Sequence, residues 1–147
     1  MVGRYLVDIL ISDTGINRFS QMTQNIPFYP GQVPVDAYGN GGFRFADMSH
    51  RGSILCLPSG ILAWDIEGQD EINLKINYEH VVSEAEQIEI LLLGTGVKQI
   101  FPQGDTRLFF ENAGVQLEAM DTGAACRTYN VLLAEQRLVA AALIAVD

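Results

Sequence analysis

The segment "GVQLEAMDTGAACRTYNVLLAEQRLVAAALI", residues 114–144, has the pattern of a strand, a helix and a second strand in succession. A helix is predicted over residues 121–136, where apolar side chains recur at the spacing of one helix face, at Ala125, Tyr129, Leu132 and Leu133. Residues 115–120 before it and 138–146 after it are short and mostly apolar, as strands inside a sheet are. Two strands joined by a helix are typical of parallel neighbours.

The same alternation of helix and strand is predicted upstream of this segment. Residues 88–93 form a nearly continuous apolar run, which predicts a central strand. Residues 104–114 predict a helix that Asp105 caps and Gly114 ends. Its packed face is expected to carry Leu108 and Phe109.

A shorter helix is predicted to begin at Asn77, because Asn is a favoured N-cap residue. Ile76 and Val81 are spaced as a hydrophobic staple around this cap. Val82 and Ala85 extend the apolar face of the helix. From residue 77 onward the order is therefore αβαβαβ, which predicts parallel strands with covering helices.

The part before residue 77 is predicted to be rich in β-structure. Residues 41–48 show the alternation of a strand. Residues 52–58 and 61–66 are apolar runs that flank a turn signal, Pro58-Ser59-Gly60, and they predict a hairpin. Antiparallel strands or a second small sheet should therefore join the parallel one. One face of the second run is expected to hold Leu62, Trp64 and Ile66.

The beginning of the chain differs in composition from the rest. Three of the five prolines, at positions 27, 30 and 34, lie before residue 40. Proline removes a backbone donor and forces the preceding residue toward extended geometry, so regular structure is hard to sustain there. We interpret residues 1–40 as an extended arm and residues 41–147 as a single globular α/β domain. Self-association through the arm is an open possibility.

The charge of the chain limits its partners. Among 147 residues, 18 are acidic and 9 are basic, which gives a formal net charge of −9. The electric field of this negative charge repels nucleic acids and anionic membranes, and no stripe of Lys or Arg offsets it. Partners with basic surfaces remain compatible with it. No stretch approaches the roughly 20 apolar residues that cross a bilayer, so no membrane insertion is expected.

The first residues and the cysteines indicate a compartment. "MVGRYLVDILIS" has neither the cleavage site of a signal peptide nor the Arg-rich, acid-poor composition of a mitochondrial presequence. Cys56 and Cys126 match no CxxC or metal spacing. We expect free, buried thiols in a reducing cytoplasm, where disulfides are rare.

A glycine turn, Gly94-Thr95-Gly96, follows the predicted central strand. A dinucleotide fingerprint needs a third glycine three positions later, but Gln99 stands there, and no Gly-Lys-Ser/Thr follows as in a phosphate loop. We therefore favour a connection whose glycines only turn the chain. Loops beyond the carboxyl ends of parallel strands nevertheless bind ligands in many α/β proteins, so a cleft remains an alternative.

A second loop of this kind, at Asp121, precedes the strongest predicted helix. Asp121 and Thr122 are expected to cap the helix start. Thr122, Cys126 and Asn130 recur every four residues and form a polar stripe. A nucleophilic cysteine normally needs a histidine base. His50, expected in a turn, and His80, expected on the solvent side of a helix, are not placed near Cys126 by the sequence, so an inert thiol is favoured.

Three blocks follow one another along the chain: "GSILCLPSGILAWD" (52–65), "IEILLLGTG" (88–96) and the segment quoted first. Through these blocks, residues 41–146 resemble a family of small domains of unknown function that includes mitochondrial complex I (NADH dehydrogenase) assembly factor 3 and uncharacterised bacterial and archaeal proteins. The most specific residues of this resemblance are Asp121-Thr122, Ala125-Cys126, Thr128-Tyr129-Asn130 and Arg137. The resemblance implies a layered β+α/β/α fold with a central mixed, largely parallel sheet and an additional small antiparallel β layer. It implies no catalytic residues.

Two functional hypotheses follow from these features. The favoured one is a non-enzymatic accessory protein that binds a partner protein, with a role in respiratory complex I biogenesis by analogy with the resemblance. The alternative is a small-ligand-binding domain or an enzyme of unassigned activity that uses a cleft between the two strand-end loops. No catalytic residue, metal ligand or cofactor is predicted. The candidate cleft consists of Gly94, Thr95, Gly96, Asp121, Thr122, Cys126 and Asn130.

Overall fold

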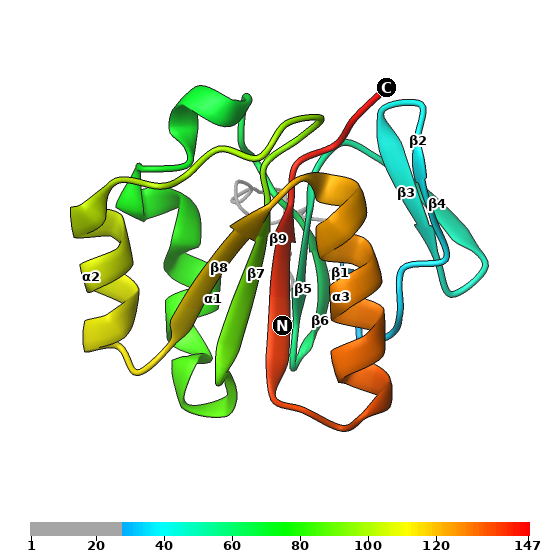
Figure 1. Ribbon diagram of the computed structural model, residues 1–147. Coiled ribbons are helices and arrows are strands. Elements are labelled where there is room, and N and C mark those ends of the chain that lie inside the picture. Colours follow the sequence, from blue (N-terminus) through cyan, green and yellow to red (C-terminus); the bar gives the residue numbers. More distant parts are fainter. Residues whose placement is uncertain (1–27) are drawn as a thin grey trace, which may run out of the picture.

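The computed structural model describes residues 28–147 and shows two sheets with packed helices (Figure 1). The strands are β1 (Phe28–Tyr29), β2 (Ala37–Gly39), β3 (Gly42–Phe45), β4 (Met48–Arg51), β5 (Ile54–Leu57), β6 (Gly60–Ala63), β7 (Ile90–Gly94), β8 (Gln116–Met120) and β9 (Val139–Leu143). The α-helices are α1 (Glu79–Ser83), α2 (Gly104–Asn112) and α3 (Thr122–Ala134). Short 3-10 turns are η1 (Gln69–Glu71), η2 (Lys75–Tyr78) and η3 (Ala85–Gln87).

The large sheet has the strand order β1-β6-β5-β9-β7-β8. Strands β9, β7 and β8 are parallel, as the αβαβαβ pattern predicts, whereas β5, β6 and β1 join antiparallel. The predicted hairpin is confirmed as β5–β6, in which Leu57 pairs with Gly60. The central mixed sheet of the predicted fold class is thus present, with a parallel half, β9-β7-β8, and an antiparallel half, β1-β6-β5.

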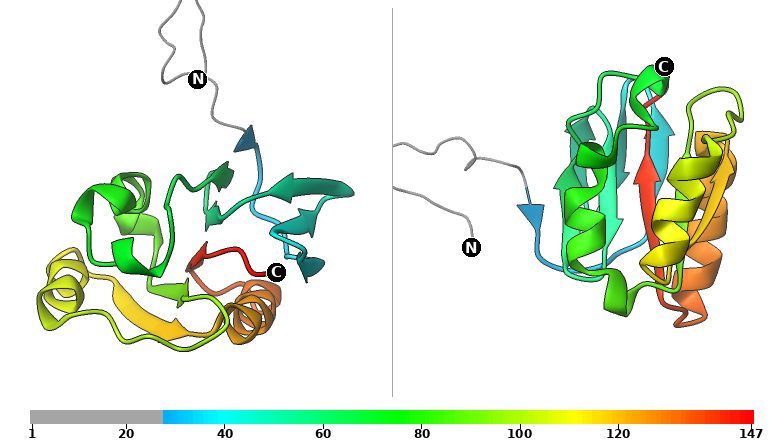
Figure 2. Two further views of the ribbon diagram at one scale, coloured as in Figure 1. Left: turned by 90° about the horizontal axis from the view of Figure 1, so that it is seen from above. Right: turned by 90° about the vertical axis from the view of Figure 1, so that its left-hand side faces the viewer.

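A second, three-stranded antiparallel sheet has the order β2-β3-β4. Seen from above, the large sheet lies between one layer with α1 and α2 and another with α3 and the small sheet (Figure 2). This is the layered β+α/β/α arrangement that the family resemblance implies.

Each face of the large sheet has its own apolar core, because alternate residues of β7 point to opposite sides. Leu91 and Leu93 pack under α1 and α2 together with Trp64, Tyr78 and Phe110. Leu92 packs on the other side, with Phe43 and Phe45 of the small sheet and Ala125 and Tyr129 of α3. The predicted buried face of the 121–136 helix is confirmed at these two α3 residues. Leu132 and Leu133 are half-buried against the same core.

The predicted helix start at Asn77 is wrong. Asn77 lies inside η2, α1 begins two residues later, and Tyr78 occupies the N-cap position. The Asn77 side chain instead donates a hydrogen bond to the carbonyl of Glu71, 2.9 Å away. Ile76 is 70% exposed, so the predicted staple does not form. Val81 is buried, but Val82 is exposed.

The helix predicted over residues 104–114 exists as α2, but its cap and packed face differ from the prediction. Gln103, not Asp105, occupies the N-cap position, and no side chain caps the helix there. The buried residues are Thr106 and Phe110. Phe109 is half-buried and packs against the same core, as predicted, whereas Leu108 is exposed. Thr106 tolerates burial because its hydroxyl donates to the side-chain oxygen of Asn73 at 2.8 Å. The predicted end is confirmed, because Gly114 has the positive φ of a helix terminus.

The strand predicted over residues 41–48 is divided into two. Ala46 and Asp47 have φ of 50° and 60°, which makes a two-residue hairpin turn between β3 and β4. His50 therefore lies in strand β4 rather than in a turn, which corrects its predicted position.

Residues 28–40 of the predicted arm lie on the body of the molecule. β1 pairs with β6 at the edge of the large sheet, and β2 pairs with β3 in the small sheet. The segment between them is held by α3, because the Tyr129 hydroxyl donates to the carbonyl of Val33 at 2.8 Å. The rest of the predicted arm, residues 1–27, lies outside the described residues.

Candidate functional site

The two strand-end loops of the candidate cleft lie side by side. Gly94 at the end of β7 pairs with Met120 at the end of β8, and both strands run in the same direction. The loop after Gly94 therefore meets the start of α3. The structure thus brings Gly94, Thr95 and Gly96 together with Asp121 and Thr122, as the sequence predicts.

Hydrogen bonds join these loops directly. The Gly96 N–H donates to the Thr122 hydroxyl at 2.9 Å, and the Thr122 N–H donates to the Gly96 carbonyl at 2.8 Å. The Thr122 hydroxyl in turn donates to the carbonyl of Ile144 at 2.7 Å. Three segments of the chain meet at one fully buried side chain.

Thr95 is also completely buried and its hydroxyl is fully engaged. It donates to the carbonyl of Lys98 at 2.6 Å and accepts from the N–H of Ile100 at 3.0 Å. Its backbone N–H donates to the carbonyl of Met120 at 2.9 Å, and its own carbonyl accepts from the side chain of Gln69. These groups stabilise the connection itself.

Gly94 fits its position because it has no side chain. A Cβ atom on Gly94 would lie 3.0 Å from Leu143 Cδ2 and 3.1 Å from Thr122 Cα. At Gly94, β7 and α3 therefore pack so closely that no side chain fits between them. We call the closed contact among residues 94–96, 120–122 and 144 the strand-end joint.

The remaining predicted residues support α3 and its neighbours. The Asp121 side chain accepts from the N–H of Ala124 at 2.9 Å, which confirms its capping role. The side-chain amide of Asn130 donates to the Val35 carbonyl at 2.8 Å and accepts from the Val35 N–H at 2.9 Å. Asn130 therefore fastens the segment before β2 onto α3 rather than lining the strand-end joint.

Cys126 is buried on the inner side of α3, near Cys56, and both thiols are free. Burial raises the pKa of Cys126 to about 12, against the smaller opposing effect of Arg127. Burial also raises the pKa of Cys56. His80 lies on α1, across the large sheet, and is exposed. A protonated, buried thiol is a poor nucleophile, so these contacts favour the inert interpretation.

Two glutamines in the neighbourhood of the joint carry contacts that sequence reasoning missed. Gln69 donates to the Thr95 carbonyl, and Gln99 donates to the Ala119 carbonyl at 2.9 Å. Both bonds join residues at least 20 positions apart, and no local pattern indicates them. Among residues 28–147, no group of three or more His, Cys, Asp or Glu residues could hold a metal ion.

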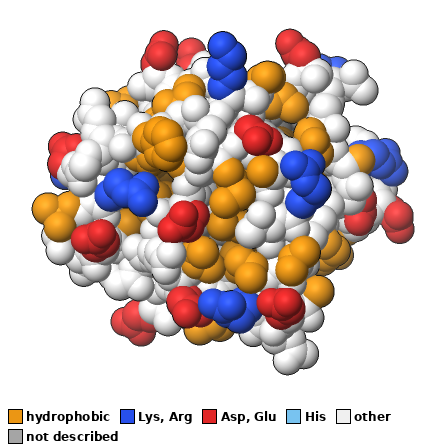
Figure 3. All heavy atoms as spheres, viewed as in Figure 1, with side chains coloured by type: hydrophobic (Ala, Val, Ile, Leu, Met, Phe, Trp, Pro, Cys, Tyr) orange, Lys and Arg blue, Asp and Glu red, His pale blue; other side chains and the backbone are white. Residues whose placement is uncertain are grey.

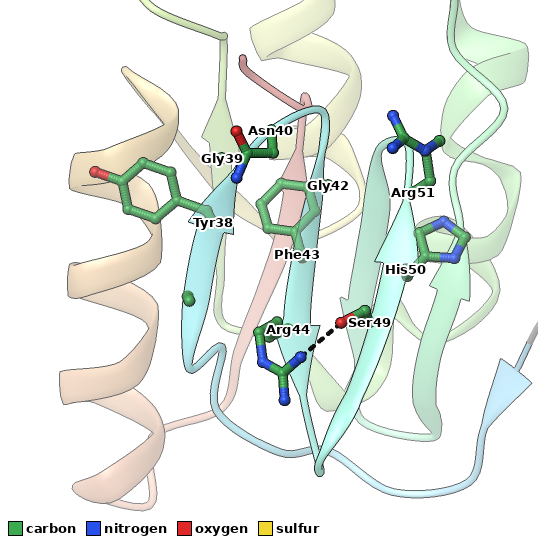
Figure 4. A pocket seen from close by; sticks show the side chains of 10 residues that line it. Tyr38, Gly39, Asn40, Gly42, Phe43, Arg44, Ser49, His50 and Arg51 are labelled. Carbon is green, nitrogen blue, oxygen red and sulfur yellow. Dashed lines mark hydrogen bonds between the residues drawn. The ribbon is translucent and has the colours of Figure 1, made fainter.

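The outer faces of the molecule offer different chemistry. The connections around η2 and between β7 and α2 carry largely exposed apolar side chains at Ile76, Val97 and Phe101, with exposed fractions of 70%, 78% and 73%. On the face drawn in Figure 3, apolar side chains reach the surface among acidic and basic ones. A hollow of about 390 Å³ covers the outer side of the small sheet, and Arg44 and Arg51 line it (Figure 4). No helix within residues 28–147 has the length and hydropathy to cross a bilayer.

Comparisons with known proteins place this domain among relatives. An uncharacterised protein of Rhodobacter capsulatus is 35% identical over 84% of this chain and 93% of its own length. NADH dehydrogenase [ubiquinone] 1 alpha subcomplex assembly factor 3 of Xenopus tropicalis is also 35% identical, over 75% of this chain. The chain spans only 60% of the length of that relative.

Solved structures and a family model agree with this relationship. A crystal structure from Bartonella henselae, described as an outer membrane protein, is 51% identical with a TM-score of 0.77, and the match covers 81% of this chain and 99% of that chain. A family model described as "Protein of unknown function (DUF498/DUF598)" matches residues 35–144. The chain therefore belongs to the DUF498/DUF598 family of proteins of unknown function.

Proposed function

We propose that this protein is a non-enzymatic accessory protein that binds partner proteins during the assembly of respiratory complex I. The observation that carries the proposal is its 35% identity to a complex I assembly factor over three quarters of the chain. The region that the family model matches, residues 35–144, includes the joint, the small sheet and α3, so it covers the body of the domain.

The chemistry of the interior supports a binding role over a catalytic one. The hydroxyls of Thr95 and Thr122 are consumed by internal hydrogen bonds, and the thiol of Cys126 is buried. Groups in such contacts are not available to a substrate without breaking the fold. We therefore expect a partner protein to bind at the outer faces of the molecule.

Exposed apolar side chains on two neighbouring connections support a protein contact. Ile76, Val97 and Phe101 leave apolar surface in water, which favours association with a partner. Their two connections are held together, because the N–H of Gln103 donates to the Asn73 side chain at 2.8 Å. A surface ordered in advance loses less conformational entropy on binding. We call Ile76, Val97 and Phe101 the apolar end.

The proposal is tested by affinity capture from the native organism, with the tagged full chain at low salt and mild cross-linking. We expect wild type to recover complex I subunits or assembly proteins, and Phe101→Ser to recover much less. Val131→Ser is the matched control, because Val131 is also exposed but lies on α3. Normal complex I assembly in a deletion strain, together with no recovered subunits, would contradict the proposal.

A further inference from the structure

Within residues 28–147, strand β4 is an unpaired edge of the small sheet. Among these residues it pairs with β3 alone, whereas α3 lies beside the opposite edge, where the Tyr38 ring of β2 lies close to Gly123 of α3. Met48, Ser49 and Arg51 are exposed. An exposed strand edge presents backbone donors and acceptors that can pair with a further strand.

The hairpin geometry shows which backbone groups face outward. In a two-residue turn, Phe45 and Met48 form a hydrogen-bonded pair, so the next pair, Arg44 and Ser49, does not bond across β3–β4. The hydrogen bond of the Arg44 carbonyl fits this alternation. The carbonyl points away from β4 and accepts from the N–H of Asp36, next to β2, at 2.8 Å. Ser49 and Arg51 therefore each direct one N–H and one C=O away from β3.

The outer face beside this edge is cationic. Arg44 and Arg51 line the hollow of about 390 Å³, and Arg44 donates to the Ser49 hydroxyl at 2.8 Å (Figure 4). Within residues 28–147 the only ion pair joins Arg137 to Glu89. Neither arginine of the hollow thus has a carboxylate partner in the described part of a chain with a net charge of −9.

The inner face beside the same edge is apolar. Met48 lies on the opposite side of β4 from Ser49 and lines a second hollow of about 140 Å³. This hollow separates β4 from the β1–β6 edge of the large sheet, and its walls include Tyr29, Ile61 and Leu62. A strand added to β4 would place alternate side chains in the two hollows.

We propose that β4 receives a strand of a partner protein in which acidic and apolar side chains alternate. The inference rests on the proposed function and names the chemistry of its partner. Backbone bonds from Ser49 and Arg51 hold the added strand, as in other cases of strand addition to a sheet edge. Carboxylates on its outer side pair with Arg51 and Arg44, whose planar guanidinium groups suit bidentate contacts. Its apolar side chains enter the hollow beside Met48.

The charges favour this occupant over a second copy of the chain. Two β4 edges side by side would bring four arginine side chains, Arg44 and Arg51 of each chain, to one outer face. Two chains that each carry −9 also repel one another over the rest of their surface. An acidic strand relieves the first conflict, because it supplies the carboxylates that the arginines lack.

The direct test measures binding of a short, capped peptide with alternating Glu and Val to the full chain by backbone amide chemical shifts. We expect saturable shifts at Ser49 and Arg51. Ser49→Pro should weaken binding about tenfold, the effect of one lost hydrogen bond, because the outward N–H disappears. That N–H makes no bond to β3, and proline is tolerated at outward positions of edge strands. Ser49→Ala, which keeps the N–H, is the matched control.

Charge reversal supplies a second readout that needs no proline. Arg44→Glu with Arg51→Glu should abolish the preference for the Glu peptide and favour a peptide with alternating Lys and Val. Arg107→Glu, a single charge reversal of the same kind on α2, should leave both affinities unchanged. No shifts in residues 42–51 at about 1 mM peptide, equal affinity for both peptides, or a dimer that Ser49→Pro dissolves would each overturn the inference.

Affinity capture separates the two proposals. If wild type and Ser49→Pro recover complex I proteins equally well, the proposed function stands and the inference about β4 fails. If neither recovers them, the proposed function fails, and the peptide titration still decides whether β4 accepts an acidic strand.

Discussion

Thr122 makes two hydrogen bonds with a single hydroxyl group. It accepts from the N–H of Gly96 and donates to the carbonyl of Ile144, and the side chain is fully buried. The same residue type at a helix start is predicted from sequence to cap the helix. Here the cap is Asp121 alone, and the threonine joins the loop after β7 to the end of β9.

Replacing this hydroxyl with a methyl group should destabilise the protein. Thr122→Val keeps the shape but leaves a buried N–H and C=O without partners, at a cost of about 2 to 4 kcal/mol. Thr122→Ser keeps the hydroxyl and loses only a methyl group, so it should cost about 1 kcal/mol. Urea denaturation measures both. A Thr122→Val protein at least as stable as Thr122→Ser would show that the joint contributes little.

The buried thiol of Cys126 should make stability depend on alkaline pH. Its pKa lies at about 12 in the folded chain, above its ordinary value of 9.0, because burial disfavours the thiolate. Between these two values the unfolded chain holds fewer protons than the folded chain, so the free energy of unfolding falls as pH rises. Below about pH 8 this thiol contributes no pH dependence.

Urea denaturation at about pH 7.5 and about pH 10 tests this sign. Burial raises the pKa of Cys56, Tyr78 and Tyr129 as well, so these groups act in the same direction. Cys126→Ala should reduce the loss at high pH. Unchanged stability between the two pH values, or a gain at the higher one, would be inconsistent with buried thiols.

Among the secondary-structure elements, the contact of β7 with α3 depends on a glycine. Gly94→Ala would place a methyl group 3.0 Å from Leu143 and 3.1 Å from Thr122, so we expect destabilisation by about 1 to 3 kcal/mol. Gly104→Ala is the matched control. Nothing lies within 4 Å of its added Cβ, and alanine in α2 should stabilise by about 0.5 to 1 kcal/mol. Thermal unfolding of the two variants should therefore shift in opposite directions, and a shared direction would refute the packing argument.

Asn130 couples α3 to the chain before β2. Asn130→Ala removes both bonds to the backbone of Val35, so amide hydrogen exchange at Val35 should accelerate by at least about tenfold. Val131→Ala on the exposed side of α3 should leave that amide unchanged. Equal exchange in the two variants would mean that other contacts hold this segment.

The elements with a strong periodic pattern could be predicted from the sequence, and the weaker ones could not. Ala125 and Tyr129 are buried as their spacing on α3 predicts, and the β5–β6 hairpin turns where Pro58-Ser59-Gly60 predicts. Asn77 fails as a cap because its side chain bonds to Glu71 instead. The buried face of α2 includes Thr106, whose burial depends on Asn73, a residue 33 positions away.

At the scale of the whole molecule, the two apolar cores lie on opposite faces of the large sheet, and the joint closes its carboxyl end. The sequence places the two loops after β7 and β8 at the same edge of a sheet. It does not show that they bond to each other, because Gln69, Thr95, Thr122 and Ile144 come from four distant segments. The proximity of the two loops was therefore predictable, and the hydrogen bonds between them were not.

The hydrogen bonds of the joint also bear on which parts of the fold can bind a partner. The interior residues that resemble a ligand loop hold the layers together, and we propose the apolar end and the β4 edge as the surfaces that bind partners. The hypothesis of a ligand cleft at Gly94, Thr95 and Gly96 stays a prediction that requires these bonds to open.

Amide hydrogen exchange at Gly96 and Thr122 tests the closure of the joint most directly. Each N–H donates to the other residue, and both residues are buried. We expect both amides to exchange as slowly as those of Leu91 and Leu92 in the centre of β7, through global unfolding only. Exchange faster by about a thousandfold, in a chain whose β7 amides stay protected, would show an open cleft and contradict this account.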